Sequence, residues 1–360
     1  MSISEYAIQQ WLFDEARGRY DIDLAESGVQ FRLLRDLEIQ PDWELDYSLD
    51  RGRPQLRGAI AEMYGGHDGA VSAGHVAVTH GAQEALYLLY RTLLRAGDHV
   101  VTTSPGWQQA WEVPRHIGCD VTVLPWPPGE RFDIEALLRA LGPRTRMITL
   151  NSPGNPSGCV LDPDDWAAVM EVAAERGIWV VNDEEYLLDF DKSVVHRHSR
   201  AISVSGLSKV FGMPALRLGW VVAAGDVIEG VVNYKRYTTV SNSLVWERAA
   251  ELVLQRRAEH VDRFRRLVEP GLRTLRDFAG RHTDTVRLVP PQGTPFAWVN
   301  TLTEASSRDI AERLLEQHRT LVMPAEVFGA EKALRVSFAR PAEVLEEGLE
   351  RLGKVLADVG

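Results

Sequence analysis

The sequence predicts an α/β fold in which a mostly parallel sheet is covered by helices on both faces. Short, continuous runs rich in Val and Ile recur between residues 76 and 224. Runs of this kind are typical of strands buried on both faces, as the strands of a parallel sheet are. Helical patterns separate these runs, and parallel strands need such crossover connections. A second, smaller α+β region is expected as well, because 360 residues suggest about two domains.

The expected elements follow in chain order. Amphipathic helices are expected at residues 3–16 and 55–64. The strands of the large sheet are expected at residues 76–78, 99–103, 120–124, 147–150, 178–181, 201–204 and 220–224. Between these strands, helices are expected at residues 82–94 and 163–176. The second helix has clear ends, because Asp162 is a candidate N-cap, Pro163 suits the first helical position and Gly177 ends the helix.

The C-terminal part of the chain has a different pattern. A long helical pattern runs from Leu244 to Asp277, strands are expected at residues 297–299 and 333–338, and a final amphipathic helix begins at Pro341. These elements predict three parts of the chain. They are residues 1–40 as an N-terminal segment that belongs partly to the small domain, 41–257 as the large domain and 258–360 as the small α+β domain.

The composition excludes several classes of protein. Lys and Arg total 40 and Asp and Glu total 51, so the formal net charge is −11. We expect no binding to nucleic acid or to anionic membranes, although a local basic pocket for one phosphate is compatible with this charge. The two cysteines, Cys119 and Cys159, exclude a disulfide framework and a four-cysteine zinc site, and no metal site is expected. There is no signal-peptide pattern and no apolar run long enough to span a membrane, so we expect a cytoplasmic protein.

Candidate site residues follow the strands, because ligands of open α/β sheets bind beyond the carboxyl ends of the strands. After the first strand, Gly81 begins a helix whose first amide groups, at Ala82 and Gln83, suit a phosphate. After the second strand, Trp107 is placed to stack on a planar ring. After the fourth strand, Asn155 lies in a rigid turn and offers an amide donor.

Two further loops carry charged residues. Asp183 follows the fifth strand, where a buried carboxylate needs a cationic partner such as a ring nitrogen. Lys209 lies in a Gly- and Ser-rich loop after the sixth strand and is a candidate for a Schiff base, and Arg217, eight residues later, suits a phosphate. Each of these features alone also has a structural explanation, such as a turn, a core aromatic, a helix cap or a solvated charge. Together, at one edge of one sheet, they predict a site for pyridoxal 5′-phosphate (PLP).

Three segments carry a resemblance to a known family. They are Asn151-x-Pro153-x-Asn155-Pro156-Ser157-Gly158, Asp183-Glu184-x-Tyr186 and Ser208-Lys209-x-x-Gly212-x-x-x-Leu216-Arg217-x-Gly219-Trp220. In order and spacing they resemble the PLP-dependent transferases of fold type I, and within them the class I/II aminotransferases. The resemblance covers essentially the whole chain. It implies transfer of an amino group between an L-amino acid and a 2-oxo acid by a homodimer with shared active sites.

The resemblance implies a role for each residue around the cofactor ring. Lys209 would form an imine with PLP and would later move the proton between the substrate α-carbon and the cofactor. Asp183 would pair with the protonated pyridine nitrogen. Asn155 and Tyr186 would form hydrogen bonds with the ring oxygen, and Trp107 would stack on the ring.

Other matching residues would bind the phosphate and the substrate. The residues of one subunit that would hold the phosphate are Ala82, Gln83, Ser208 and Arg217. Tyr47 would reach the phosphate of the neighbouring subunit. Arg335 would bind the substrate α-carboxylate. Gly28, in the segment 26–29 that would cover the substrate, and Asn155 would complete the substrate site.

The sequence departs from the family pattern at two positions. Gly206 stands three residues before Lys209, where Ser or Thr is usual. One phosphate hydroxyl is therefore missing, or Ser205 or Ser208 supplies it. Glu185 stands where an apolar residue is common.

Two alternatives stay open for the function. Residues 113–115 and 235–239 are similar to those of a bacterial subgroup with capreomycidine-synthase-like enzymes, which cyclise an arginine-derived amino acid. A PLP-dependent elimination or cyclisation enzyme of natural-product biosynthesis needs the same lysine, aspartate and arginine. Glu26 and Glu185 indicate a cationic substrate side chain, unless they are surface residues. A regulatory or binding protein on the same fold is disfavoured, because Lys209, Asp183 and Arg217 are all present.

Overall fold

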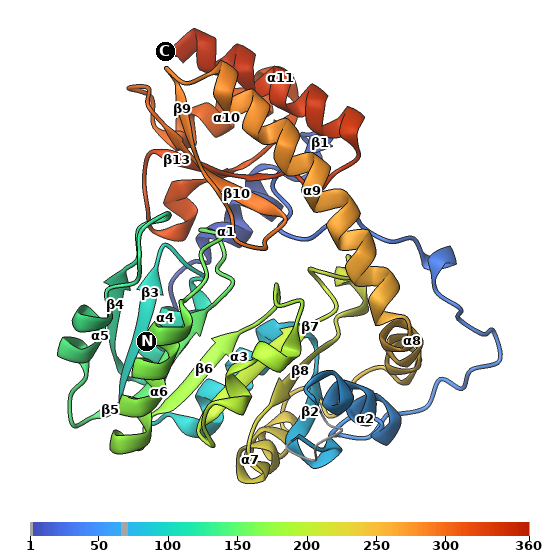
Figure 1. Cartoon of the computed structure of the whole chain (residues 1–360). Coiled ribbons are helices and arrows are strands. Elements are labelled where there is room, and N and C mark those ends of the chain that lie inside the picture. Colours follow the sequence, from blue (N-terminus) through green and yellow to red (C-terminus); the bar gives the residue numbers. More distant parts are fainter. Residues whose placement is uncertain (1–2, 66–70, 360) are drawn as a thin grey trace.

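A seven-stranded sheet forms the centre of the larger part of the molecule (Figure 1). The computed structural model describes residues 3–65 and 71–359. The strands lie in the order β2 (Val76–Thr79), β8 (Gly219–Val222), β7 (Ala201–Gly206), β6 (Trp179–Asp183), β5 (Thr145–Asn151), β3 (His99–Ser104) and β4 (Asp120–Pro125). Strand β8 is antiparallel to its two neighbours, and the other neighbouring pairs are parallel. The predicted, mostly parallel sheet is confirmed.

Helices cover both faces of this sheet, because successive side chains of a strand point to opposite faces. Val100 and Val181 pack on one face, and Val101 and Val180 pack on the other. The helices on the first face are α3 (Gly81–Leu93), α4 (Gln109–Ile117) and α7 (Gly225–Lys235). The helices on the second face are α2 (Pro54–Met63), α5 (Ile134–Ala140), α6 (Pro163–Arg176) and α8 (Leu244–Gln255).

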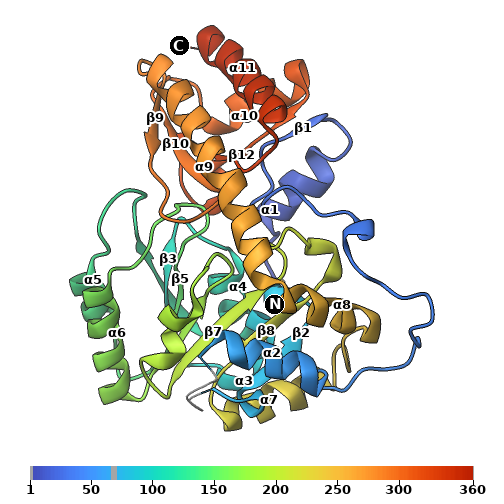
Figure 2. The same cartoon turned by 45° about the vertical axis from the view of Figure 1, so that its right-hand side comes forward.

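A smaller antiparallel sheet lies beside the large one (Figures 1 and 2). Its strands lie in the order β12 (Met323–Pro324), β13 (Ala333–Ser337), β10 (Phe296–Thr301) and β9 (Val286–Val289). The helices that pack with it are α9 (Arg257–Arg281), α10 (Ser307–His318) and α11 (Ala342–Val359). The long helix α9 runs from α8 to this second sheet, and so links the two parts of the molecule (Figure 1).

The N-terminal segment packs mainly on the smaller sheet, and its first residues also contact the larger part of the molecule, where the amide of Ala7 donates to Oε1 of Gln108 at 2.9 Å. It contains α1 (Ala7–Gln9), a π-helical turn (Gln10–Glu15) and β1 (Ile22–Asp23), which pairs in parallel with β11 (Thr320–Leu321). The indole Nε1 of Trp11 donates to the carbonyl of Val322 at 2.9 Å. The segment then continues to the loop that carries Lys209, where Glu26 contacts the amine of Lys209. Short 3₁₀ turns occur at Leu34–Asp36, Ala73–His75, Phe190–Lys192, Val194–His196, Pro214–Leu216 and Ala325–Phe328.

Some expected elements differ from the structure. The helix expected at 3–16 begins only at Ala7, and the long pattern from Leu244 is two helices separated at Arg256. Helix α6 has the expected bounds, and Gly177 takes a left-handed φ of 66°. Asp162 stands at the N-cap of α6, but its side chain makes no cap hydrogen bond within the described structure.

Helices α4, α5, α7 and α10 were not expected from the sequence pattern. Helix α4 contains Pro114, which normally interrupts a helical pattern. Helix α5 is short, although the carboxylate of Asp133 caps it by accepting a hydrogen bond from the Ala136 amide at 2.8 Å. No helix in the ranges 3–65 and 71–359 is both long and apolar enough to cross a membrane. The same ranges hold no cluster of His, Cys, Asp and Glu suited to a metal ion.

Candidate active site

A pocket lies beyond the carboxyl ends of β5, β6 and β7, beside the N-terminus of α3. Most of the residues that the sequence singled out line this pocket. They are Ala82, Gln83, Trp107, Asn155, Asp183, Tyr186, Ser208, Lys209 and Arg217. Their convergence follows from topology, because parallel neighbouring strands end at the same edge of a sheet.

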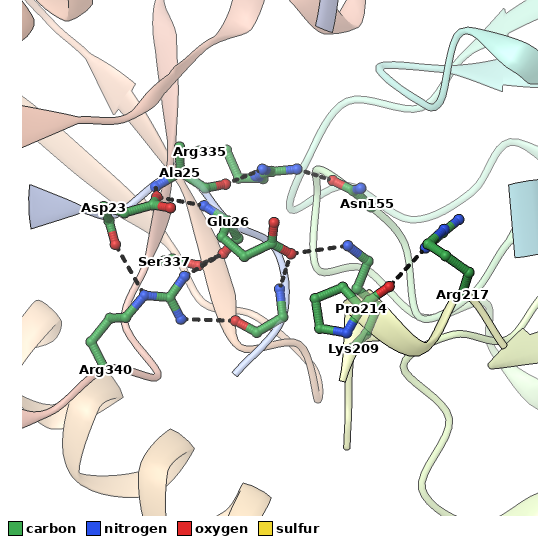
Figure 3. A network of polar contacts seen from close by, with 11 residues as sticks. Asp23, Ala25, Glu26, Asn155, Lys209, Pro214, Arg217, Arg335, Ser337 and Arg340 are labelled. Atoms are coloured by element: carbon green, nitrogen blue, oxygen red, sulfur yellow. Dashed lines mark hydrogen bonds and ion pairs between the residues drawn. The ribbon is translucent and has the colours of Figure 1, made fainter. Parts of the chain in front are cut away.

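The amine of Lys209 faces a carboxylate from the N-terminal segment. Its Nζ donates to Oε1 of Glu26 at 3.0 Å (Figure 3). Burial alone would lower the pKa of Lys209, but the adjacent Glu26 carboxylate raises this pKa above its ordinary value. Burial would in turn raise the pKa of Glu26, but Lys209 lowers it to about 2. Both groups are therefore charged at neutral pH, and Glu26 is not a surface residue.

A network of backbone contacts holds Glu26 in this position (Figure 3). Its amide donates to Oδ1 of Asp23 at 2.9 Å, and its Oε1 also accepts from the Gly28 amide at 3.0 Å. Its carbonyl accepts from Nη2 of Arg340 at 2.8 Å and from the Ser337 hydroxyl. A Cβ at Gly28 would lie 3.1 Å from the Ser208 carbonyl oxygen, so a residue without a side chain lets the segment lie close to the Lys209 loop. Gly28 thus packs behind the pocket.

Arg335 reaches the pocket from the smaller sheet. It lies on β13, is only 2% exposed, and donates from Nη1 to Oδ1 of Asn155 at 2.7 Å (Figure 3). A second hydrogen bond goes from Nη2 to the Ala25 carbonyl. The guanidinium lies 5.1 and 5.0 Å from the ring centroids of Phe296 and Phe328. Its Nε is buried and has no partner among the described residues. Burial lowers the pKa of Arg335 to about 10, so it stays cationic at neutral pH.

Asp183 and Tyr186 occupy the end of β6 and the turn after it. Burial raises the pKa of Asp183 to about 6, and its Oδ1 accepts from the Glu185 amide at 3.1 Å. Within the described structure this carboxylate has no ion-pair partner. The Tyr186 ring packs edge-on against Phe296, with centroids 5.2 Å apart, and burial raises the pKa of Tyr186 to about 12.

The opposite end of the pocket is suited to an anion. Helix α3 begins there at Gly81, so the amides of the first helical turn are not used in the helix. A Cβ at Gly81 would lie 2.6 Å from Nη2 of Arg217, and one at Gly219 would lie 2.6 Å from the Ala82 nitrogen. These two glycines let the guanidinium of Arg217 and the amides of α3 lie close together. Ser208 is buried beside them.

Trp107 forms one wall of the pocket. Its Nε1 donates to Oε1 of Gln83 at 2.8 Å. Tyr6 and Gln9 also line the pocket, and the Tyr6 ring meets the Trp107 ring edge-on at 5.7 Å. Tyr6 and Gln9 were not expected at the site, because an aromatic or amide residue in a short amphipathic helix carries no signal for a distant site.

Three expected site residues, Gly28, Arg335 and Tyr47, are not among the residues that line the pocket. Arg335 contacts the pocket through Asn155, as described above. Tyr47 is 83% exposed and makes an isolated bridge with Ser243, so it does not complete the pocket of its own chain.

Comparisons with known proteins identify the family. The model of the aminotransferases of class I and II matches residues 44–352. The chain is 30% identical to a capreomycidine synthase from Streptomyces vinaceus, with 97% of this chain and 93% of the relative covered. It is 30% identical to an aspartate aminotransferase from Streptomyces avermitilis (87% and 82% covered) and 31% identical to an arginine–pyruvate transaminase from Pseudomonas aeruginosa (87% and 83% covered).

A solved structure agrees with these matches. A PLP-dependent aminotransferase from Streptococcus suis superposes with a TM-score of 0.93 at 26% identity, over 100% of this chain and 99% of that one. The chain belongs to the class I and II aminotransferase family and is a PLP-dependent enzyme.

Proposed function

We propose that this enzyme transfers the amino group of an L-amino acid with a cationic side chain to a 2-oxo acid. The observation that carries the proposal is the convergence, in one pocket, of the Lys209 amine, the Asp183 carboxylate and an anion cradle, with Arg335 reaching in from the smaller sheet. We also propose the domain division expected from the sequence, with the cofactor in the large domain at 41–257 and Arg335 in the small one.

The pocket residues fit the cofactor. The Asp183 carboxylate is half-buried and lacks a cationic hydrogen-bond partner in the described part of the chain, and a protonated pyridine nitrogen would supply one. The amides of Ala82 and Gln83, with Ser208 and Arg217, match the donors that a phosphate requires. When bound, PLP withdraws electrons from the substrate α-carbon. Trp107 would then stack on the ring.

Residues of this chain bind the cofactor and the substrate and move the proton. Lys209 binds the cofactor through Nζ and moves the proton at the substrate α-carbon. Asp183 holds the ring nitrogen in its protonated form. Asn155 and Tyr186 form hydrogen bonds with the ring oxygen. The planar guanidinium of Arg335, with its unpartnered Nε, binds the α-carboxylate and so orients the Cα–H bond.

The charge of the pocket supports the substrate class. The relatives include one named for aspartate and one named for arginine, so relatedness alone does not decide the class. Glu26 places an ionised carboxylate beside Lys209, where it would attract a cationic side chain and repel an acidic one. Among the described residues that line the pocket, Arg217 at the anion cradle is the only arginine, so no arginine beyond Arg217 and Arg335 is placed to bind a second carboxylate of the substrate.

We keep one second candidate, the elimination or cyclisation of an arginine-derived amino acid. The observation that favours it is the same carboxylate of Glu26, together with the match to a capreomycidine synthase over 97% of this chain. Transamination and cyclisation need the same proton transfer by Lys209, so the pocket supports both.

A panel of amino acids mixed with the cofactor-loaded enzyme, without any oxo acid, tests the proposal. Transamination yields one equivalent of 2-oxo acid per site, measured by mass spectrometry, and arginine or ornithine should react faster than aspartate. An altered or cyclised amino acid with the cofactor unchanged would replace our first candidate by the second. No reaction with any amino acid, in a protein that binds PLP, would contradict both.

We further propose a homodimer with shared sites in the cytoplasm. Three exposed residues with large apolar or aromatic side chains, Leu45, Tyr47 and Tyr237, are 92%, 83% and 85% exposed. Their exposure supports burial against a second copy, whose phosphate site Tyr47 would reach. Both cysteines are free and buried, in agreement with a reducing compartment.

A further inference from the structure

Glu185 is a buried carboxyl group with no partner. It is 6% exposed, and within residues 3–65 and 71–359 neither Oε1 nor Oε2 has a hydrogen-bond donor or acceptor. It nevertheless lines the pocket, between Asp183 and Tyr186 in the chain. Buried polar groups are normally satisfied, so both oxygens of Glu185 are free to bind a group that enters the pocket.

The carboxyl group of Glu185 fills space that Gly206 leaves open. A Cβ at Gly206 would lie 2.5 Å from Oε1 of Glu185. Gly206 is the position, three residues before Lys209, at which the family resemblance implies a Ser or Thr hydroxyl. Any side chain at 206 would therefore compete with Glu185 for one place.

This place lies beside the anion cradle. Gly206 pairs with Gly219 across β7 and β8, and a Cβ at Gly219 would lie 2.6 Å from the Ala82 nitrogen at the start of α3. Glu185 thus occupies the glycine-lined floor next to the amides of α3 and the guanidinium of Arg217.

The serines near Gly206 differ in whether they can replace the missing hydroxyl. The Ser205 hydroxyl donates to the Glu184 carbonyl at 3.2 Å, so it is already used. Ser208 lines the pocket and accounts for one donor. The donor expected from position 206 therefore has to come from another side chain.

The protonation state of Glu185 permits this role. Burial raises its pKa to about 8, and the neighbouring Asp183 carboxylate acts in the same direction. Glu26 also acts in this direction, whereas the cations Lys209 and Arg217 act against it. The acid is accordingly neutral at pH 7, and a neutral carboxylic acid donates one O–H.

We infer that Glu185 is a cofactor-binding residue that donates its O–H to the PLP phosphate, in place of the hydroxyl that Gly206 lacks. The inference rests on the proposed function, because it requires PLP in this pocket. It goes further, because it makes a neutral carboxylic acid part of the phosphate site.

Two variants and two cofactor forms test the inference. Glu185→Gln keeps the shape and an N–H donor, and Glu185→Leu keeps the approximate volume without a donor. The dissociation constants of PLP and of pyridoxal, which lacks the phosphate, are measured by absorbance for each protein. Glu185→Leu should weaken PLP binding by roughly tenfold or more, as loss of a hydrogen bond to a charged group does, and leave pyridoxal binding unchanged. Glu185→Gln should stay close to wild type for both.

The pH dependence of cofactor binding distinguishes the carboxylic acid of the wild type from the amide of Glu185→Gln. In the wild type the preference for PLP over pyridoxal should decline above pH about 8, where Glu185 ionises and repels the phosphate. In Glu185→Gln the preference should not show this decline. Ionisation of Lys209 affects the binding of PLP and of pyridoxal alike. The ratio of the two affinities therefore cancels this effect.

The outcomes are distinct. If Glu185→Leu weakens the binding of PLP and of pyridoxal equally, or weakens neither, the inference is wrong. The proposed function would still stand in that case, provided that the wild type binds PLP. A wild type that binds no PLP would overturn both. If Glu185→Leu does not fold, judged by circular dichroism, the profile of Glu185→Gln decides, and a decline equal to that of wild type would reject the role of Glu185.

Discussion

Nζ of Lys209 and Oε1 of Glu26 lie 3.0 Å apart, although 183 positions separate the two residues in the chain. The contact joins the loop after β7 to the segment that packs on the smaller sheet. It places an ionised carboxylate next to the amine on which the proposed chemistry depends.

Glu26→Gln should change which amino acids bind. Removal of one carboxylate from a partly buried site should weaken the binding of arginine by roughly tenfold or more. Binding of a neutral amino acid such as alanine should change little, because it has no cation to pair with Glu26. Titration of the cofactor-loaded variant with both amino acids measures the two affinities. An equal loss of affinity for arginine and alanine would mean that Glu26 only positions Lys209 and does not bind the substrate side chain.

Asp183→Asn should bind PLP but remove the substrate α-proton slowly. The amide carries no charge to hold the ring nitrogen protonated, and loss of such an electrostatic contact slows a reaction by roughly 100-fold or more. Exchange of the α-proton with deuterated water, followed by NMR, measures the step. Asp191→Asn, which changes an exposed carboxylate, is the matched control. Exchange at the wild-type rate in Asp183→Asn would show that Asp183 is only structural.

Arg335→Lys should weaken substrate binding and leave the cofactor spectrum unchanged. Lysine keeps the positive charge but loses the planar fork, and with it the paired contact to a carboxylate and to Asn155. Affinity for the amino acid should fall by roughly tenfold or more. Rapid-mixing absorbance with one amino acid, compared between wild type and variant, gives the result. Unchanged affinity would mean that another group binds the α-carboxylate.

Tyr47 should act across a dimer interface. Sedimentation should show a dimer or a multiple of it. Tyr47→Phe should weaken PLP binding, and mixing it with Lys209→Ala under subunit exchange should restore sites of wild-type affinity. Each restored site would combine the Lys209 of one chain with the Tyr47 of the other. A fully active monomer would contradict this assignment.

Glu185→Gln should stabilise the cofactor-free protein at high pH. The pKa of Glu185 rises from 4.5 to about 8 on folding, so the folded state holds this proton more tightly than the unfolded chain. The contribution of this pKa shift to the free energy of unfolding is fully present below pH 4.5 and is lost as the pH rises to about 8. The variant should therefore melt at a higher temperature than wild type at pH 9, by at least roughly 2 °C, and show no such gain at pH 5. Glu175→Gln, an exposed change on α6, should show no pH-dependent difference.

Much of the site was predictable from local sequence. The strands are short apolar runs, and the loops after them carry Asp183, Lys209 and Arg217 in family spacing. Since parallel strands end at one edge, knowing the order of strands and loops was enough to expect these side chains in one pocket, where the structure has them.

Other features depended on contacts between distant segments. Arg335 meets Asn155 only because the smaller sheet packs beside the large one, and no local pattern specifies that packing. Glu26 and Glu185 were open to interpretation as surface residues, but the structure buries Glu185 and pairs Glu26 with Lys209. The contact of Tyr6 with Trp107 also joins segments that are far apart in the sequence.

The sequence by itself determined the sheet, the loops at its edge and the residue types available for PLP chemistry, because short-range apolar patterns and turn residues encode these directly. Only the tertiary structure decided the electrostatics of the site. The pKa values of Asp183, Glu185 and Lys209 depend on burial and on charges brought from remote segments. The effect of Gly206 also depends on the tertiary structure, because the space that a side chain at 206 would take is filled by Oε1 of Glu185, which follows the neighbouring strand β6.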